Sequence, residues 1–379
     1  MAEPAPPLDR ALFAVTSDRI YLNHAAVGVL PQPTVEALHA FVDAHAKGGV
    51  LGTFPYEGAM AEYRERVAAS IGASGAEIAI LRNTSEGANV LARGFDLRPG
   101  DEVLVPAEEF PSNAWPWRAL RTQGVIVREL DCSTELLNPE RLAREIGSRT
   151  RVVALSWISY VDGARHDLAG LSTVAHDRGV ALVVDAIQGL GALDLDVRAS
   201  GVDALYAGGA KWLCALQGVA LLYVSSALRE RLRVAAPGWR SVADLWDFHN
   251  DRQDWIDDAS RFEGGTPNFI GALSLATSLD LFAGVGIARI ERHVAALRER
   301  LAKGVRALGA TVLDRSGSEG VSGILTFSVA GRESIALGRA LQSEGFVTTW
   351  RANGIRVSPH GYNTLGEIDA FIAALAANV

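Results

Sequence analysis

The sequence predicts an α/β fold, in which a large, mostly parallel sheet covered by helices is followed by a smaller α+β domain. From about residue 60 onward, short runs rich in Val, Leu and Ile alternate with amphipathic helical stretches. Strands that are buried on both faces have such continuous apolar runs, and ligands of these folds bind at the carboxyl ends of the strands. After about Asn268, long helices with short strands take over, which indicates the second domain.

Seven apolar runs bounded by Gly, Pro or Asp are the expected strands of the large sheet, since this punctuation favours strands over buried helix segments. They are Glu77–Leu81, Glu102–Pro106, Val125–Glu129, Val152–Ser156, Ala181–Asp185, Ala204–Ala207 and Val219–Val224. The helices expected between them are Gly87–Gly94, Ala114–Thr122, Pro139–Ile146 and Leu168–Arg178.

The second domain is expected to combine a long helical region with a small sheet. Its helices are Ile270–Leu308, Ser334–Ser343 and a last one from Thr364, and its apolar runs are Gly323–Val329 and Ile355–Ser358. We therefore divide the chain into an N-terminal segment, a large domain and a small domain, with bounds 1–25, 26–260 and 261–379. The stretch Pro237–Glu263, rich in Trp, Asp and Arg, is expected to be an irregular connector.

The composition is that of a globular protein, with 49% hydrophobic and 21% charged residues among 379. A net charge of −8 argues against nucleic acid as a partner. No apolar run has the length of a membrane span, and the first twenty residues lack the apolar centre of a signal peptide. Two cysteines offer neither a disulfide framework nor a zinc set, and the eight histidines show no metal-binding spacing. We expect a cytoplasmic enzyme or binding protein without metal.

Lys211 and Asp185 are the most informative residues. Asp185 ends one buried strand, and Lys211 follows the next strand, 26 residues later. Pyridoxal phosphate chemistry needs this pair: the lysine amine forms a Schiff base with the cofactor aldehyde, and the carboxylate pairs with the protonated pyridine nitrogen. Asp185 alone would more often cap a helix, so the prediction depends on both residues in this order.

Three further stretches suit the same cofactor, each with a structural alternative. Thr84 and Ser85 open a helix after a strand, where backbone amides favour a phosphate, although an ordinary helix cap is the alternative. Phe110 can stack on the pyridine ring or pack in the core. Gln188 can donate to the cofactor's phenolic oxygen or extend a turn.

Arg356 interrupts an apolar strand, so it should meet either a substrate carboxylate or a buried acid.

Taken together, the chain resembles the class V aminotransferase family of fold-type I pyridoxal phosphate enzymes, which includes cysteine desulfurases, isopenicillin N epimerase and kynureninase. The resemblance runs from Tyr21 to Thr364. Its most specific stretches are Asn83-Thr-Ser-Glu86, Val184-Asp-Ala-Ile-Gln-Gly-Leu-Gly-Ala192, Ala210-Lys-Trp212 with Gly218, and Phe262-Glu-Gly-Gly-Thr-Pro-Asn268.

The resemblance implies a role for each matching residue. Lys211 is the implied Schiff-base lysine and catalytic residue, and Asp185, Gln188, Thr84, Ser85 and Phe110 complete the cofactor site. Arg356 is implied to hold the substrate carboxylate, and Asn23, His24 and Ala25 to line the substrate site, although a solvent-facing turn is an equal alternative for His24. Thr266 matches a residue that reaches the phosphate of the neighbouring subunit. The family therefore implies a homodimer with shared active sites.

Departures from the family pattern bear on the reaction. Many relatives have a histidine where this chain has Phe110, which cannot titrate, so Lys211 must carry more of the proton transfer. Gly208-Gly209-Ala210 replaces a Ser-x-His that helps to bind phosphate, and Tyr160 replaces an asparagine. Desulfurases need a cysteine on a loop that would fall between Thr348 and Arg356, and none is present there; Cys214 is expected to be a packing residue.

These features predict an enzyme that acts on a small α-amino acid through a Schiff base and a Cα carbanion. We place transamination first. The alternatives are a C–S lyase that works by β-elimination without a persulfide cysteine, or an epimerase like isopenicillin N epimerase. A non-catalytic cofactor-binding module is a remote alternative, because both Lys211 and Asp185 are present.

Overall fold

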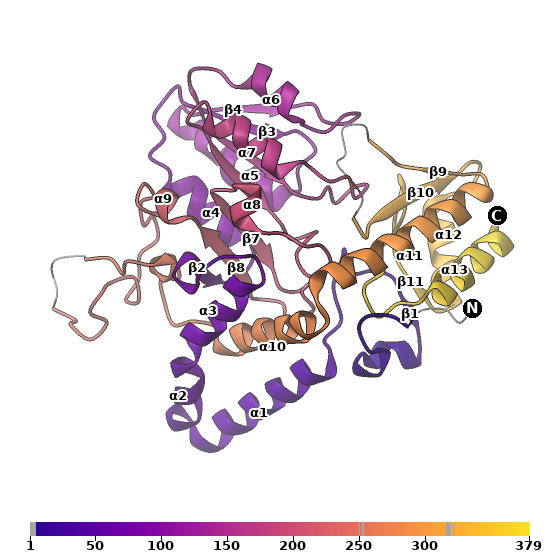
Figure 1. Ribbon diagram of the computed structural model, residues 1–379, viewed down its shortest axis with the longest axis horizontal. Coiled ribbons are helices and arrows are strands. Elements are labelled where there is room, and N and C mark those ends of the chain that lie inside the picture. The colour runs from indigo at the N-terminus through magenta and orange to yellow at the C-terminus, as the bar shows by residue number, and fades with distance from the viewer. Residues whose placement is uncertain (1–4, 250, 252–253, 316–319, 321) are drawn as a thin grey trace.

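A computed structural model describes residues 5–249, 251, 254–315, 320 and 322–379. Parts of the predicted N-terminal segment (1–4) and connector (250 and 252–253) lie outside the described residues. Figure 1 shows a large sheet with helices around it and, to one side, a smaller sheet next to which the C-terminus lies. The α/β fold predicted from the sequence is confirmed.

A seven-stranded sheet forms the centre of the large unit, with strand order β2-β8-β7-β6-β5-β3-β4. β8 runs opposite to the other six strands, so the sheet is mostly parallel. Its strands are β2 Ile78–Leu81, β3 Glu102–Pro106, β4 Ile126–Leu130, β5 Thr150–Ser156, β6 Ala181–Asp185, β7 Ala204–Gly208 and β8 Ala220–Val224. Each of the seven predicted runs overlaps one of them.

Helices cover both faces of this sheet because successive strand residues point to opposite sides. Val152 and Val183 belong to a core shared with α4 Thr84–Gly94 and α5 Pro111–Ala119. Their neighbours Val153 and Val184 belong to the core on the other face. The remaining helices of this part are α1 Gln32–Gly48, α2 Val50–Gly58, α3 Met60–Ala69, α6 Pro139–Glu145, α7 Leu168–His176, α8 Val197–Ser200 and α9 Ser226–Arg229.

The long helical region predicted after Asn268 divides in two at Gly286, whose φ of 87° favours glycine. The helices α10 Phe269–Val285 and α11 Ile287–Ala307 are bent by 82° there. α10 packs in the core of the large unit, whereas α11 runs toward the small sheet (Figure 1). No single helix in the described ranges is long and apolar enough to span a membrane; only this bent pair passes that test, and only when taken together.

The small unit is an antiparallel sheet of order β12-β13-β10-β9 with helices packed on it. Its strands are β9 Ala310–Val312, β10 Leu325–Val329, β12 Thr349–Arg351 and β13 Gly354–Val357, and its remaining helices are α12 Ser334–Ser343 and α13 Leu365–Asn378. The short strand β1 Ile20–Tyr21 pairs in parallel with β11 Phe346–Val347. This pairing brings the N-terminal segment to the small unit, beside the active-site candidates on β13.

Candidate active site

Lys211 and Asp185 lie at the same edge of the large sheet, because β6 and β7 are parallel neighbours that both end there. Asp185 is almost fully buried, and burial raises the pKa of its carboxyl to about 7. The amide of Ile187 donates to its Oδ1 at 3.0 Å. Burial lowers the pKa of Lys211 to about 8, against the opposing effect of Asp185. A lysine with a lowered pKa is a better nucleophile and base near neutral pH.

Phe110 and Tyr160 form an aromatic wall beside the Lys211 amine. Phe110 directly precedes α5, and its ring centroid lies 5.5 Å from Lys211 Nζ. The Tyr160 ring meets Phe110 edge-on, with centroids 5.2 Å apart. More than a third of the Phe110 side chain is exposed, so its ring can receive a flat ligand rather than serving only as core.

Gln188 is held from two sides. Its Nε2 donates to the carbonyl of Ala25 at 3.1 Å, and its Oε1 accepts from Trp212 Nε1 at 2.9 Å. An amide nitrogen has two hydrogens, so one remains for a ligand oxygen. Ala25 and Trp212 therefore orient the residue that the sequence assigned to the cofactor's phenolic oxygen.

The start of α4 offers free amides and hydroxyls to an anion, as the sequence analysis predicts. The Asn83 side chain caps the helix by accepting a hydrogen bond from the Glu86 amide. The amides of Thr84 and Ser85 donate to none of the described residues. Ser85 Oγ lies 2.8 Å from Ser112 Oγ, which adds a third hydroxyl. A Cβ at Gly208 would lie 3.0 Å from Thr84 Oγ1, so a larger residue there would press on this helix start. Backbone amides at a helix N-terminus suit a phosphate dianion.

Arg356 projects from β13 and is 8% exposed. Its guanidinium donates to the Tyr160 carbonyl at 2.9 Å, and its Nε has no partner among the described residues. Burial lowers its pKa to about 10, and no carboxylate offsets this effect. The buried acid that was the alternative partner is therefore not present in this part of the structure, and the remaining donors are available to an anionic ligand.

The N-terminal segment reaches the site through hydrogen bonds rather than as a surface turn. Asn23 Oδ1 accepts from Thr349 Oγ1 at 2.7 Å. His24 is fully buried, which rules out the solvent-facing turn, and its ring lies between the Ser358 carbonyl and the Tyr362 hydroxyl. Burial holds the pKa of His24 well below its usual value, so a neutral ring is expected. A direct substrate contact of His24 stays a prediction.

Two predictions of the sequence analysis receive different support. Thr266 is exposed just before α10, so a contact with a neighbouring subunit remains a prediction. Cys214 is fully buried, and burial raises the pKa of its thiol to about 12, as expected of a packing residue. The thiol of Cys132 is also buried, with its pKa raised to about 11.

Glu109 is a site residue that the sequence analysis missed. Its carboxylate accepts from the amide of Ser156 at 2.6 Å and from the Ser156 hydroxyl. Removal from water raises the pKa of Glu109, and its charge in turn raises the pKa of Asp185. The position directly before Phe110 was the only available signal, since the contact with Ser156 joins the ends of two strands.

These residues fit pyridoxal phosphate: an amine, an opposed carboxylate, a flat ring wall and a phosphate cradle converge at one edge of the sheet. Bound there, the cofactor supplies an aldehyde for amines and an electron sink for charge at the substrate Cα. Lys211 is placed to move protons, and Asp185 to stabilise a positive ring nitrogen.

Comparisons with known proteins identify the family. The family model for aminotransferase class V matches residues 20–371. A probable cysteine desulfurase of Methanothermobacter thermautotrophicus is 31% identical, over 82% of this chain and 78% of its own. Cysteine desulfurase CsdA of Escherichia coli is 30% identical, over 98% of this chain and 96% of its own. The apo structure of a cysteine desulfurase from Thermococcus onnurineus superposes with a TM-score of 0.89 at 26% identity, covering 100% of this chain and 99% of its own. The chain belongs to the aminotransferase class V family, a family of pyridoxal phosphate-dependent enzymes.

Proposed function

We propose that this enzyme is a C–S lyase that cleaves the Cβ–S bond of a cysteine-derived amino acid by β-elimination. The support comes from relatives at 30% and 31% identity that carry the name cysteine desulfurase. Transamination, which the sequence analysis placed first, has no comparable support among them. The C–S lyase was the stated alternative, and it becomes the leading reaction.

We assign each step to a residue of the described site. Arg356 binds the α-carboxylate, and Phe110 fixes the plane of the cofactor ring. The neutral amine of Lys211 takes the proton from the substrate Cα. The Cβ–S bond then breaks, with its electron pair leaving on sulfur. The three-carbon fragment is released and hydrolysed to pyruvate and ammonia, and Lys211 returns its proton to the products or to water.

The burial of both cysteines is the observation that favours β-elimination over the transfer of sulfur to a cysteine of the enzyme. The chain contains only Cys132 and Cys214, and both are buried with raised pKa values. A thiol accepts sulfur as an exposed thiolate, and neither side chain meets this condition. The sulfur atom therefore leaves with the group that is expelled from Cβ of the substrate.

The test measures products from the cofactor-loaded protein with L-cysteine, L-cystine and S-substituted cysteines. Elimination predicts equal amounts of pyruvate and of a thiol, sulfide or persulfide product. The Lys211→Ala variant should form neither, whereas the Cys132→Ala/Cys214→Ala variant should form both. Amino transfer to an added α-keto acid, without pyruvate formed from the cysteine substrate, would contradict the proposal and favour transamination.

We further propose a homodimer with shared active sites, as the family resemblance implies. Thr266 is exposed, and the connector carries Trp246 and Phe248, which are more than 70% exposed. Large exposed aromatic side chains are typical of interfaces. Sedimentation of the cofactor-loaded protein should give twice the chain mass of 40.3 kDa. A Thr266→Ala variant should bind the cofactor more weakly, and a monomer with full activity would contradict this proposal.

A further inference from the structure

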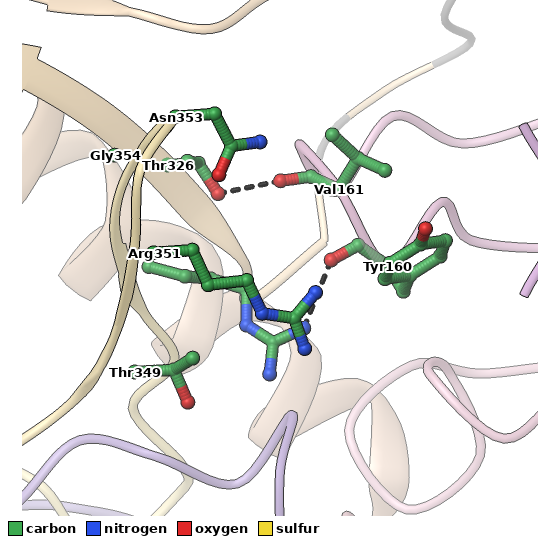
Figure 2. A pocket seen from close by; sticks show the side chains of 8 residues that line it. Tyr160, Val161, Thr326, Thr349, Arg351, Asn353 and Gly354 are labelled. Carbon is green, nitrogen blue, oxygen red and sulfur yellow. Dashed lines mark hydrogen bonds between the residues drawn. The ribbon is translucent and has the colours of Figure 1, made fainter.

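A second arginine, Arg351, lies with Arg356 at one small cavity. The cavity has a volume of about 70 Å³ and is lined by the β12–β13 hairpin, Thr326 and the loop that carries Tyr160 and Val161. Figure 2 shows the Arg351 side chain extending across this pocket toward Tyr160. A volume of roughly 10–15 Å³ already holds a water molecule, so the cavity accommodates a carboxylate group.

The strand register places both arginines on the same face of the small sheet. Thr349 pairs directly with Arg356 across the β12–β13 hairpin. Arg351 lies two residues after Thr349 on β12, and alternate residues of a strand point to the same side. The two arginines are therefore diagonal neighbours, a separation that long side chains can bridge. The hairpin is tight, with Arg351 paired to Gly354, so their relative position is fixed.

No acid of the described residues neutralises this pair. Arg351 makes no ion pair with any of them, and Arg356 donates only to the Tyr160 carbonyl. The charge of Arg351 adds to burial in lowering the pKa of Arg356. Burial is the main cause of the lowered pKa of Lys211, and the charges of both arginines act in the same direction. Two unpaired guanidinium groups at one cavity indicate a ligand with more than one negative charge.

Arg356 and Arg351 lie at different depths, so we assign them to different ends of the substrate. Arg356 is buried, with its Nε turned away from water, whereas Arg351 is exposed at the rim. The α-carboxylate of an amino acid bound near Lys211 lies close to the cofactor and thus takes the deeper cation. The group attached to sulfur extends outward from Cβ, toward the rim.

We propose that Arg351 binds a second carboxylate, carried by the sulfur substituent of the substrate, so that the preferred substrate is a cysteine S-conjugate with an acidic leaving group. This inference rests on the proposed C–S lyase function for the identity of the leaving group. Arg351 is a specificity-determining residue, and it selects the leaving group while Arg356 holds the amino-acid part.

The test compares S-carboxymethyl-L-cysteine with S-carbamoylmethyl-L-cysteine, which have nearly the same shape and differ in one charge. Binding is measured by calorimetry on cofactor-loaded Lys211→Ala protein, in which the catalytic amine is absent. The acid should bind at least about tenfold more tightly than the amide. In an added Arg351→Gln background this ratio should fall to about one, and Arg351→Lys should restore part of it. Arg332→Gln, a change at an exposed arginine outside the site, should keep the full ratio.

The outcomes separate the competing interpretations. If Arg351→Gln weakens both ligands and keeps their ratio, both arginines hold the α-carboxylate and the proposal is wrong. An unchanged affinity for both ligands would equally overturn it. Circular dichroism checks that each variant is folded. This experiment measures binding, whereas pyruvate release tests the lyase function separately. Tighter binding of the acid than of the amide, lost in Arg351→Gln, would therefore support the second anion site even if wild-type protein released no pyruvate.

Discussion

Titration of Asp185 should set the pH dependence of stability in the cofactor-free protein. The pKa of its carboxyl is raised from 3.8 to about 7 by burial and by the charge of Glu109. Between these values the unfolded chain has lost the proton that the folded chain retains. Stability therefore falls as pH rises through this window, and the contribution is fully lost once the pH exceeds the folded pKa.

The magnitude follows from the size of the shift. One pKa unit corresponds to about 1.4 kcal/mol, so a shift of about three units is worth about 4 kcal/mol in total. About 3 kcal/mol of this loss should fall between pH 5 and pH 8. An asparagine does not titrate, so the Asp185→Asn variant should lack this loss. Its stability relative to wild type should rise by the same amount across the interval.

The assay is urea denaturation of cofactor-free wild-type and Asp185→Asn protein at pH 5 and pH 8. Comparing the two proteins cancels the titrating groups that do not interact with Asp185, including the buried histidines. Asp177→Asn, at an exposed aspartate where α7 ends, should follow wild type at both pH values. A parallel pH dependence of wild type and Asp185→Asn would refute the reasoning, because it would mean that Asp185 is ionised in both states.

Three further substitutions test other contacts. Trp212→Phe removes the donor to Gln188 Oε1, and should cost about 1–3 kcal/mol of unfolding free energy in urea, with exposed Trp115→Phe as the unchanged control. Phe110→Leu removes the ring that can stack on the flat cofactor and should weaken cofactor binding about 2- to 12-fold in a fluorescence titration. Arg315→Leu leaves the buried Asp162 unpaired and should cost about 3–5 kcal/mol, of which an added Asp162→Asn should recover a large part. A loss below 1 kcal/mol for Arg315→Leu would mean that Asp162 finds another partner.

The large sheet could be predicted from sequence because buried parallel strands are apolar along their whole length. The predicted runs match β3 and β6 to the residue, and the other strands differ by one or two residues at an end. The pairing of β1 with β11 could not be predicted, since two-residue strands have no periodicity and these lie at opposite ends of the chain. The helices α1 to α3 were not predicted either, because Gly48, Gly49 and Pro55 interrupt their pattern.

The site residues also fall into those that a local sequence pattern predicts and those that depend on contacts between distant segments. Lys211 and Asp185 could be predicted because Asp185 ends one recognisable strand and Lys211 follows the next, and parallel strands bring their carboxyl ends together. Glu109 and Arg351 depend on contacts that no local pattern records. Glu109 reaches the site through Ser156 on another strand, and Arg351 through the register of a three-residue strand with β13. Sequence motifs therefore identified the cofactor, while the structure was needed to find the second cation.

The ionisable groups of this site are not fully compensated by one another in the cofactor-free protein. Burial disfavours the charged forms of Asp185, Lys211 and Arg356, and each has its pKa shifted toward the neutral form. In the proposed complex, a cationic ring nitrogen would relieve Asp185, a covalent bond to the cofactor would remove the charge of Lys211, and a carboxylate would relieve Arg356. The folded chain is thus destabilised at the positions where cofactor and substrate bind, so binding energy adds directly to stability. At pH 8, where Asp185 of the cofactor-free protein is ionised, cofactor should raise the unfolding free energy more in wild type than in Asp185→Asn, because the variant has no buried charge to relieve.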